Sequence, residues 1–153
     1  MSGLEYSSQD SMQIDGNRFH HSTTLRVRYA DTDAMGVVYY ANYLAFFEVG
    51  RVELLRAAQA DYRSVEADGA VAAVTRADCR YRIPARFDDL LVIHTRIAGM
   101  GRATMRFEYE IRRQSDDALL AEGYTEHACL DRTTFRPIRL PPVVREALTR
   151  LQA

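Results

Sequence analysis

The feature that most restricts the fold is one long helical pattern followed by a run of alternating strands. Between residues 41 and 60 no proline interrupts the segment, and apolar side chains recur at helical spacing. They form one stripe of period 3.6, at Tyr43, Phe46, Phe47, Gly50 and Leu54. A glycine inside a helix lowers stability by about 1 kcal/mol relative to alanine. We therefore expect Gly50 to allow close packing against a neighbouring element.

Alternating apolar and polar residues predict the strands. One precedes the helix, and the others follow it, at residues 23–29, 70–81, 90–97, 103–111 and 119–130. A short closing helix is predicted at residues 143–151. Strand, long helix, four antiparallel strands and a last helix indicate an α+β domain. One helix can cover only one face of the sheet, so we expect a second copy of the chain to cover the other.

Composition sets broad limits on function and location. With 153 residues, 47% apolar and 27% charged, the chain suits one globular domain at residues 20–153. A net charge of -1 argues against a nucleic-acid partner. We expect no membrane span, since no apolar run reaches the required ~18 residues. Cys79 and Cys129 lie far apart, which favours a reducing cytoplasm. Residues 1–19, rich in Ser, Gln, Asp and Gly, are predicted to be a disordered leader.

Two carboxylates stand in a predicted turn just before the long helix, at Asp31 and Asp33. A helix N-terminus offers unpaired N–H groups and a partial positive charge. It can hold a developing oxyanion while a carboxylate attacks or activates water, as acyl transfer requires. No metal is needed, and the spacing of His and Cys predicts none. The ordinary alternative for Asp33 is an N-terminal cap of the helix.

The segment around these carboxylates resembles a family signature. It reads Asp31-Thr32-Asp33-Ala34-Met35-Gly36-Val37-Val38-Tyr39-Tyr40-Ala41-Asn42-Tyr43. It is similar to the 4-hydroxybenzoyl-CoA thioesterase family, and most similar to its YbgC-type, Tol–Pal-associated acyl-CoA thioesterases. Two further stretches add to the resemblance, which covers roughly residues 20–142: Pro84-Ala85-Arg86-Phe87-Asp88-Asp89-Leu90 and Thr125-Glu126-His127-Ala128-Cys129-Leu130-Asp131.

The resemblance implies a hotdog fold, in which a five- to six-stranded antiparallel sheet wraps a long central helix. It implies a homodimer with a continuous sheet, further association into a homotetramer, and sites formed between two subunits. The implied activity is hydrolysis of an acyl-CoA to a free acid and CoA. No cofactor is expected, because coenzyme A is part of the substrate.

The resemblance also implies roles for individual residues. Asp33 is the expected nucleophile or general base, and the Tyr40 backbone N–H the group that holds the thioester carbonyl. Five further positions are predicted to bind substrate: Gly36, Val37, Val38, Asn42 and Tyr43. Tyr43 also fits the apolar stripe of the helix, so core packing is an alternative for it. Glu48 is a possible second carboxylate, although a helix salt bridge to Arg51 is favoured.

Substrate preference stays open at this point. Many YbgC-type members carry a histidine where Tyr40 stands, while relatives of the benzoyl type carry tyrosine. Short, medium-chain and aromatic acyl groups are therefore all candidates. Arg86, Arg102 and Arg132 are candidates for holding CoA phosphates.

Two rival functions are weighed against the thioesterase. A hydroxyacyl dehydratase on the same fold needs an acid–base histidine, and no histidine stands just before the helix. A non-catalytic acyl-CoA-binding or scaffold protein is the second alternative, and the intact Asp33 motif argues against it.

Overall fold

The fold is known from a computed structural model that describes residues 19–60, 62–67 and 69–152. The predicted leader therefore lies outside the described residues, apart from Phe19. The elements in chain order are β1 (His21–Arg26), η1 (Tyr29–Asp31), α1 (Asn42–Ala57), α2 (Tyr62–Ala67), β2 (Ala70–Tyr81), β3 (Leu90–Met100), β4 (Thr104–Arg113), β5 (Leu119–Asp131) and α3 (Pro142–Gln152). None of the helices within those ranges is both long enough and apolar enough to cross a membrane.

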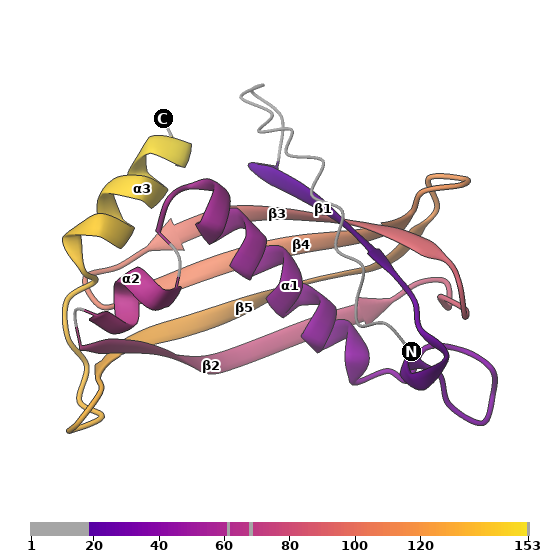
Figure 1. Ribbon diagram of the computed structural model, residues 1–153, viewed down its shortest axis with the longest axis horizontal. Coiled ribbons are helices and arrows are strands. Elements are labelled where there is room, and N and C mark those ends of the chain that lie inside the picture. The colour runs from indigo at the N-terminus through magenta and orange to yellow at the C-terminus, as the bar shows by residue number, and fades with distance from the viewer. Residues whose placement is uncertain (1–18, 61, 68, 153) are drawn as a thin grey trace.

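The five strands form one antiparallel sheet in the order β1-β3-β4-β5-β2. Helix α1 runs across one face of this sheet, and α2 and α3 lie toward the end of the molecule where α1 finishes (Figure 1). The predicted α+β hotdog architecture, with a long helix wrapped by an antiparallel sheet, is confirmed. Strands β1 and β2 are the two edges of the sheet.

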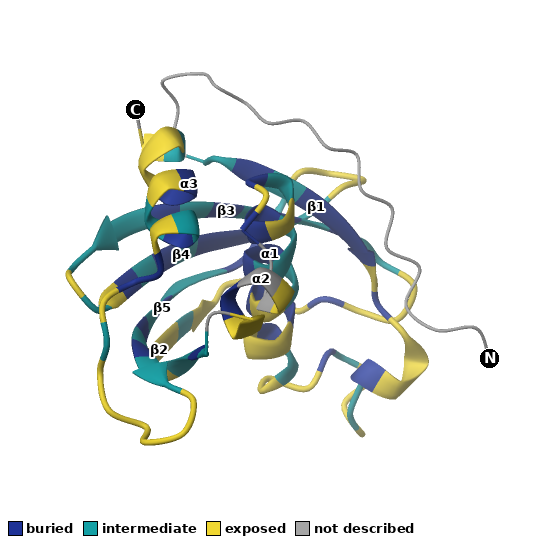
Figure 2. Ribbon diagram, turned by 60° about the vertical axis from the view of Figure 1, so that its left-hand side comes forward, coloured by how far each residue is buried: buried dark blue, intermediate teal, exposed yellow. Residues whose placement is uncertain are grey.

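The core lies between α1 and the sheet, where buried residues line the facing surfaces (Figure 2). The Phe47 ring stacks on the Tyr109 ring of β4, with 4.4 Å between centroids and 6° between planes. Leu54, Phe107 and Ile111 are also fully buried there. Strand β4 places alternate side chains under the helix, as a half-buried strand should. The predicted stripe on the helix is the buried surface.

Gly50 is the point of closest approach between α1 and the sheet. A Cβ at this position would lie 2.4 Å from Thr95 Oγ1 and 2.7 Å from Ile93 Cγ2. Both contacts are too short for real atoms, so any side chain here must push the helix away from β3. The expectation that Gly50 allows close packing is confirmed.

The opposite face of the sheet carries charged side chains in cross-strand pairs. Arg96 Nη2 of β3 lies 2.6 Å from Glu108 Oε2 of β4, and Arg106 Nη1 of β4 lies 2.9 Å from Glu126 Oε1 of β5. A sheet with one such solvated face is ordinary for antiparallel strands. The expectation that a second copy covers this face stays a prediction.

The structure differs from the sequence-based expectation at several elements. Strand β1 ends at Arg26, because residues 29–31 turn into η1. Helix α1 stops at Ala57, two residues before Gln59 adopts a positive φ of 61°. Helix α2 was not predicted, since its six residues are too few to show a helical period.

Replacing Gly50 with alanine should lower the free energy of unfolding by up to about 2 kcal/mol. Overpacking typically costs about 1–3 kcal/mol, and the better helix propensity of alanine offsets about 1 kcal/mol of that. Urea denaturation measures the change. Gly99→Ala is the matched control, because a Cβ there meets nothing within 4 Å. Thr95→Ala added to Gly50→Ala removes the nearer of the two contacts and should restore part of the lost stability, and the overpacking explanation is wrong if it restores none.

Candidate active site

The Asp33 segment forms a small hairpin between η1 and α1. Thr32 bridges Val38, and the Asp33 N–H donates to the Val37 carbonyl at 2.9 Å. The tip closes with the Gly36 N–H donating to the Asp33 carbonyl at 3.0 Å. Gly36 has a φ of 78°, which glycine adopts without the strain that a side chain would bring. The hairpin holds Asp33 at a defined place ahead of the helix.

The Asp33 carboxylate is half-buried, and only one of its oxygens is used. Oδ1 accepts a hydrogen bond from the Met35 N–H at 2.9 Å, while Oδ2 has no hydrogen-bond partner among the described residues. The helix cap residue is Ala41, which makes no side-chain cap bond. The capping role considered for Asp33 is therefore wrong, and Oδ2 is available for chemistry.

The head of α1 presents two unpaired N–H groups. The Asn42 N–H donates to the Tyr39 carbonyl at 2.9 Å, and the Tyr43 N–H reaches the Tyr40 carbonyl at 3.4 Å. Within the described part of the chain, neither the Tyr40 N–H nor the Ala41 N–H has an acceptor. These N–H groups carry the positive end of the helix dipole. They form an anion-binding position at the start of the helix.

Asp33 and the helix head face the same small region. The pKa of Tyr39 is raised, first by its side-chain hydrogen bond with the neighbouring Tyr40 and also by the negative charge of Asp33. The Tyr39 and Tyr40 rings lie 4.8 Å apart between centroids. The Tyr40 side chain is 62% exposed. The structure therefore brings the two predicted catalytic residues to one exposed surface.

Asp31, the other carboxylate of the motif, is structural. Its carboxylate is buried and accepts hydrogen bonds from the Arg28 N–H at 2.8 Å and the Arg28 Nη2 at 2.9 Å. Its carbonyl accepts from the Asn42 side chain and from the Tyr39 N–H, both at 2.9 Å. Asp31 thus ties β1, the hairpin and the helix head together, and Asn42 contributes to that tie.

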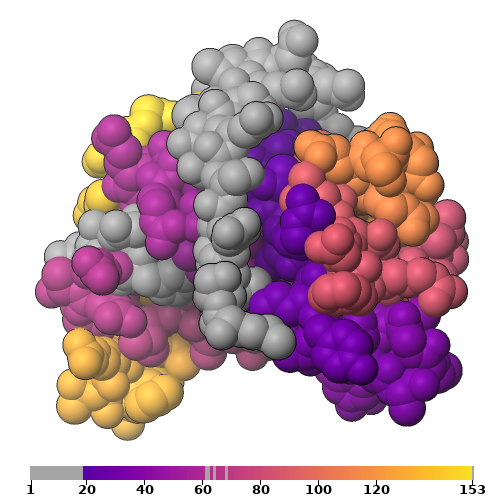
Figure 3. Space-filling model, turned by 45° about the vertical axis from the view of Figure 1, so that its right-hand side comes forward, coloured from indigo at the N-terminus to yellow at the C-terminus, as the bar shows by residue number. Residues whose placement is uncertain are grey.

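The second motif stretch, residues 84–90, is a wall of the site. The Val38 N–H donates to the Ala85 carbonyl at 2.8 Å, and the Ala85 N–H donates to the Tyr43 hydroxyl at 3.0 Å. Asp88 and Asp89 anchor the stretch by pairing with the backbone of Val27. The hairpin and this stretch lie side by side at one end of the molecule (Figure 3). The sequence indicated this stretch only through the family resemblance. Its hydrogen bonds to Val38 and Tyr43 join residues more than 40 positions apart, which local patterns do not reveal.

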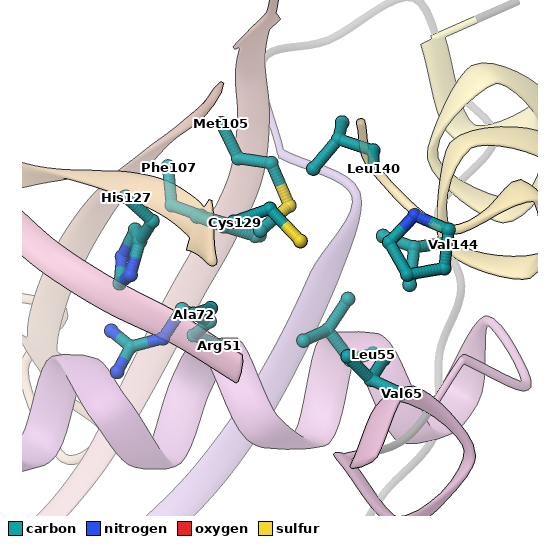
Figure 4. A pocket seen from close by; sticks show the side chains of 11 residues that line it. Arg51, Leu55, Val65, Ala72, Met105, Phe107, His127, Cys129, Leu140 and Val144 are labelled. Carbon is teal, nitrogen blue, oxygen red and sulfur yellow. The ribbon is translucent and has the colours of Figure 1, made fainter. Parts of the chain in front are cut away.

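The third motif stretch supplies a buried polar chain beneath α1. The Arg51 Nη1 donates to the Tyr109 hydroxyl at 3.1 Å, and that hydroxyl shares a 2.6 Å hydrogen bond with Thr125. The Thr125 hydroxyl also lies 2.8 Å from His127 Nε2. Arg51 and His127 border an apolar cavity of about 20 Å³ near the end of α1 (Figure 4). That volume suits about one water molecule. This chain gives buried polar groups hydrogen-bond partners beneath the helix.

Burial lowers the pKa of His127 to about 4, and the nearby Arg51 charge lowers it further in the same direction. His94, on the outer face of β3, lies 2.6 Å from the Ser22 hydroxyl through its Nδ1. Neither histidine belongs to the surface that holds Asp33. The structure leaves Asp33 as the carboxylate with a free oxygen beside the helix head.

Glu48 does not pair with Arg51. The Arg51 side chain turns inward to Tyr109, whereas Glu48 is exposed and makes no ion pair with any described residue. The predicted salt bridge is wrong, because the Arg51 guanidinium is directed into the core, where it binds the Tyr109 hydroxyl. Glu48 borders a separate hollow of about 660 Å³ between α1 and β1, together with Arg28 and Asp31. Its role as a second carboxylate stays a prediction.

The remaining predicted residues lie close to Asp33 but differ in exposure. Val38 and Tyr43 are buried, Val37 and Asn42 are half-buried, and Gly36 is exposed. Their substrate-binding role stays a prediction, and the burial of Tyr43 agrees with core packing. Across the described ranges, no three His, Cys, Asp or Glu side chains gather where a metal ion could bind.

Residues 27–148 match the Thioesterase-like superfamily. The chain belongs to this superfamily. It is 34% identical to the acyl-CoA thioesterase YbgC of Haemophilus influenzae over 132 residues, covering 86% of this chain and 96% of that relative. It is 37% identical to the acyl-CoA thioester hydrolase YbgC of Escherichia coli, covering 76% and 87% of the two chains.

Solved structures agree with the family assignment. The protein TT1821 of Thermus thermophilus superposes with a TM-score of 0.79 at 37% identity, covering 85% of this chain and 98% of that one. A DHNA-CoA thioesterase of Staphylococcus aureus superposes with a TM-score of 0.81 at 31% identity, covering 86% and 89%. The resemblance seen in the motifs is confirmed, and the chain is a thioester hydrolase of this superfamily.

The buried chain predicts a pH dependence of stability. His127 has a pKa of about 4 when folded and about 6.5 when unfolded, so the unfolded state binds more protons between those values. The free energy of unfolding should therefore rise with pH from about 4 to 6.5, with up to about 3 kcal/mol from this group.

His127→Gln should flatten that rise while leaving stability at pH 7 within about 1 kcal/mol, because glutamine can still reach Thr125. Urea denaturation at several pH values gives both curves. An unchanged slope between pH 4 and 6.5 in the variant would assign the dependence to other groups.

Proposed function

We propose that this protein hydrolyses a short-chain, medium-chain or aromatic acyl-CoA to the free acid and CoA, with Asp33 as the reacting carboxylate. One observation carries the proposal. The unpaired Oδ2 of Asp33 stands ahead of a helix whose first N–H groups, at Tyr40 and Ala41, have no acceptor in the described chain. A carboxylate and an oxyanion-binding position are the two parts that thioester hydrolysis needs.

In the proposed mechanism, the Tyr40 N–H donates a hydrogen bond to the thioester carbonyl oxygen and stabilises the charge that develops on it. Asp33 then acts in one of two ways. It attacks the carbonyl carbon, so that the C–S bond breaks and water cleaves the resulting anhydride, or it takes a proton from a water that attacks directly. The departing CoA thiolate needs no strong acid, since thiols have a pKa near ~8.5.

Apolar surface next to Asp33 supports an acyl group as the bound part of the substrate. Most of the exposed large apolar side chains lie in residues 29–44, around Asp33 and the helix head, or in residues 81–87, from the end of β2 into the wall. They are Tyr29, Met35, Tyr39, Tyr40, Leu44, Tyr81, Ile83 and Phe87. Tyr29 and Phe87 meet edge to face with 5.8 Å between centroids. Exposed apolar surface of this kind marks binding sites. Aliphatic and aromatic acyl groups both suit it.

Within one copy of the protein, the three arginines proposed to hold CoA phosphates are not close to one another. Arg86 belongs to the wall beside Asp33, whereas Arg102 follows β3 and Arg132 follows β5. Strand β3 and strand β5 both end away from the Asp33 hairpin (Figure 1). Of the three, Arg86 is the one that a substrate bound at Asp33 of the same chain would meet first.

We also propose a homodimer formed along β2. Among the described residues this strand pairs only with β5, and residues 74–78 are exposed. An open edge presents backbone groups that another strand can pair with. A dimer built here places the second copy next to Tyr81 and hence next to the site. The homotetramer and the cytoplasmic location stay predictions.

The function is tested by measuring thiol release from a panel of acyl-CoAs that runs from acetyl to palmitoyl and includes benzoyl and hydroxybenzoyl. Wild type should hydrolyse at least one member. Asp33→Asn should lower kcat/KM by at least ~100-fold, which corresponds to about 2.7 kcal/mol of barrier. Asp117→Asn is the matched control: Asp117 is exposed in the β4–β5 turn, and asparagine accepts its φ of 55°.

Binding without hydrolysis would favour the alternative, a non-catalytic acyl-CoA-binding or scaffold protein. Full activity of Asp33→Asn would instead move the search to Glu48. Calorimetric titration with the same panel separates these outcomes, because it reports binding whether or not the thioester is cleaved.

The dimer is tested by light scattering on a gel-filtration column over a range of concentrations. Wild type should elute with twice the mass of the chain. Val74→Lys places a charge on an exposed position of the β2 edge and should shift the protein toward monomer. Because the second copy lies beside the site, specific activity of this variant should fall on dilution. A monomeric wild type with full activity would contradict the proposed assembly.

A further inference from the structure

Tyr81, at the end of β2, reaches across to the head of α1. Its hydroxyl donates a hydrogen bond to the Tyr40 carbonyl at 3.0 Å, although the two residues are 41 positions apart. No motif assigned this tyrosine a role. We propose that Tyr81 is a positioning residue that holds the first peptide units of α1 in place to bind the thioester carbonyl. This inference rests on the proposed function, because it concerns the N–H groups assigned there.

The Tyr81 ring is held on two sides. It meets the Tyr40 ring with 6.4 Å between centroids and 80° between planes, and the Tyr43 ring with 5.2 Å and 84°. Edge-to-face pairs of this kind add about 0.5–1.5 kcal/mol beyond burial. Tyr43 is itself fixed by the bond that its hydroxyl accepts from the Ala85 N–H. The contacts with Tyr40 and Tyr43 therefore fix the orientation of the Tyr81 side chain, so that its hydroxyl points to the Tyr40 carbonyl.

The carbonyl that Tyr81 binds is otherwise weakly engaged. Its bond inside the helix, from the Tyr43 N–H, is long at 3.4 Å, so the bond from Tyr81 is the shorter of the two. Helix ends fray where their first bonds are weak. A fixed Tyr40 carbonyl restrains the peptide planes on both sides of Tyr40. The unpaired N–H groups of Tyr40 and Ala41 belong to those two planes.

The same bond strengthens one of the donors. The Tyr40 carbonyl and the Ala41 N–H belong to one peptide unit, and a hydrogen bond accepted by the oxygen polarises the N–H. A polarised N–H at a helix N-terminus stabilises an oxyanion more than a thioester carbonyl. Loss of the Tyr81 hydroxyl should therefore affect the transition state more than the bound substrate.

Tyr81 stays protonated and able to donate under ordinary conditions. Burial, followed by the neighbouring Cys79 thiol, raises the pKa of Tyr81 to about 12. Burial likewise raises the pKa of Cys79 to about 11, although its hydrogen bond with Tyr81 acts in the opposite direction. Both groups are neutral near pH 7. The bond runs from Tyr81 to Tyr40 because a carbonyl oxygen can only accept.

The test compares Tyr81→Phe with wild type, using the acyl-CoA that wild type hydrolyses fastest. The variant keeps both ring contacts and loses only the hydroxyl. A small misplacement of binding groups can lower rates by up to 10²-fold. We expect kcat to fall about tenfold while KM stays within about twofold. Tyr124→Phe, on the outer face of the sheet, makes the same chemical change and should leave both constants unchanged.

A spectroscopic readout separates positioning from a general loss of structure. The same acyl-CoA, labelled with ¹³C at its carbonyl, is bound to Asp33→Asn and to the Asp33→Asn/Tyr81→Phe double variant. Isotope-edited infrared difference spectra then report how strongly the protein polarises the carbonyl. The carbonyl band should shift to lower frequency in the single variant and shift less in the double variant.

The outcomes distinguish the two proposals. If wild type cleaves nothing, or Asp33→Asn stays fully active, the proposed function fails, and the inference fails with it. If Asp33 is required but Tyr81→Phe keeps wild-type kcat, only the inference fails. An equal carbonyl shift with and without the Tyr81 hydroxyl also overturns it, whatever the change in kcat.

Discussion

The close contact of α1 with the sheet at Gly50 is the constraint on which the rest of the structure depends. A glycine there lets the helix backbone lie directly on Ile93 and Thr95 of β3. The stack of Phe47 on Tyr109 then forms at a ring separation of 4.4 Å. Because α1 is rigid, its distance from the sheet at Gly50 also fixes the position of its N-terminus. That position decides whether the helix head faces Asp33.

The site depends on contacts between distant parts of the chain. The Asp33 hairpin is followed directly in sequence by the head of α1. Neither segment is held by local hydrogen bonds alone. Ala85 accepts from Val38 and donates to Tyr43, and Asp31 ties the helix head back to β1. A loop that carries a reacting group needs such support, because precise placement governs rate. The wall formed by residues 84–90 supplies it.

Polar groups are distributed according to what each region must do. The buried chain from Arg51 to His127 satisfies its members inside the core, where an unpaired polar group would be costly. The outer face of the sheet is charged and suits water. Apolar side chains are exposed mainly around Asp33 and along the nearby end of β2. The buried chain thus supports stability, the outer face of the sheet contacts water, and the exposed apolar surface is left for binding.

The sequence by itself determined the fold class, the strand β2 to its last residue, the helix within a few positions, and the Asp33 motif. These features depend on local periods and on a motif contained in 13 consecutive residues. Tertiary structure alone decided that Arg51 turns inward away from Glu48, that Asp33 caps no helix, and that Tyr81 meets Tyr40. Each of those facts depends on which residues from other elements lie opposite. Spacing along the chain carries no information about that.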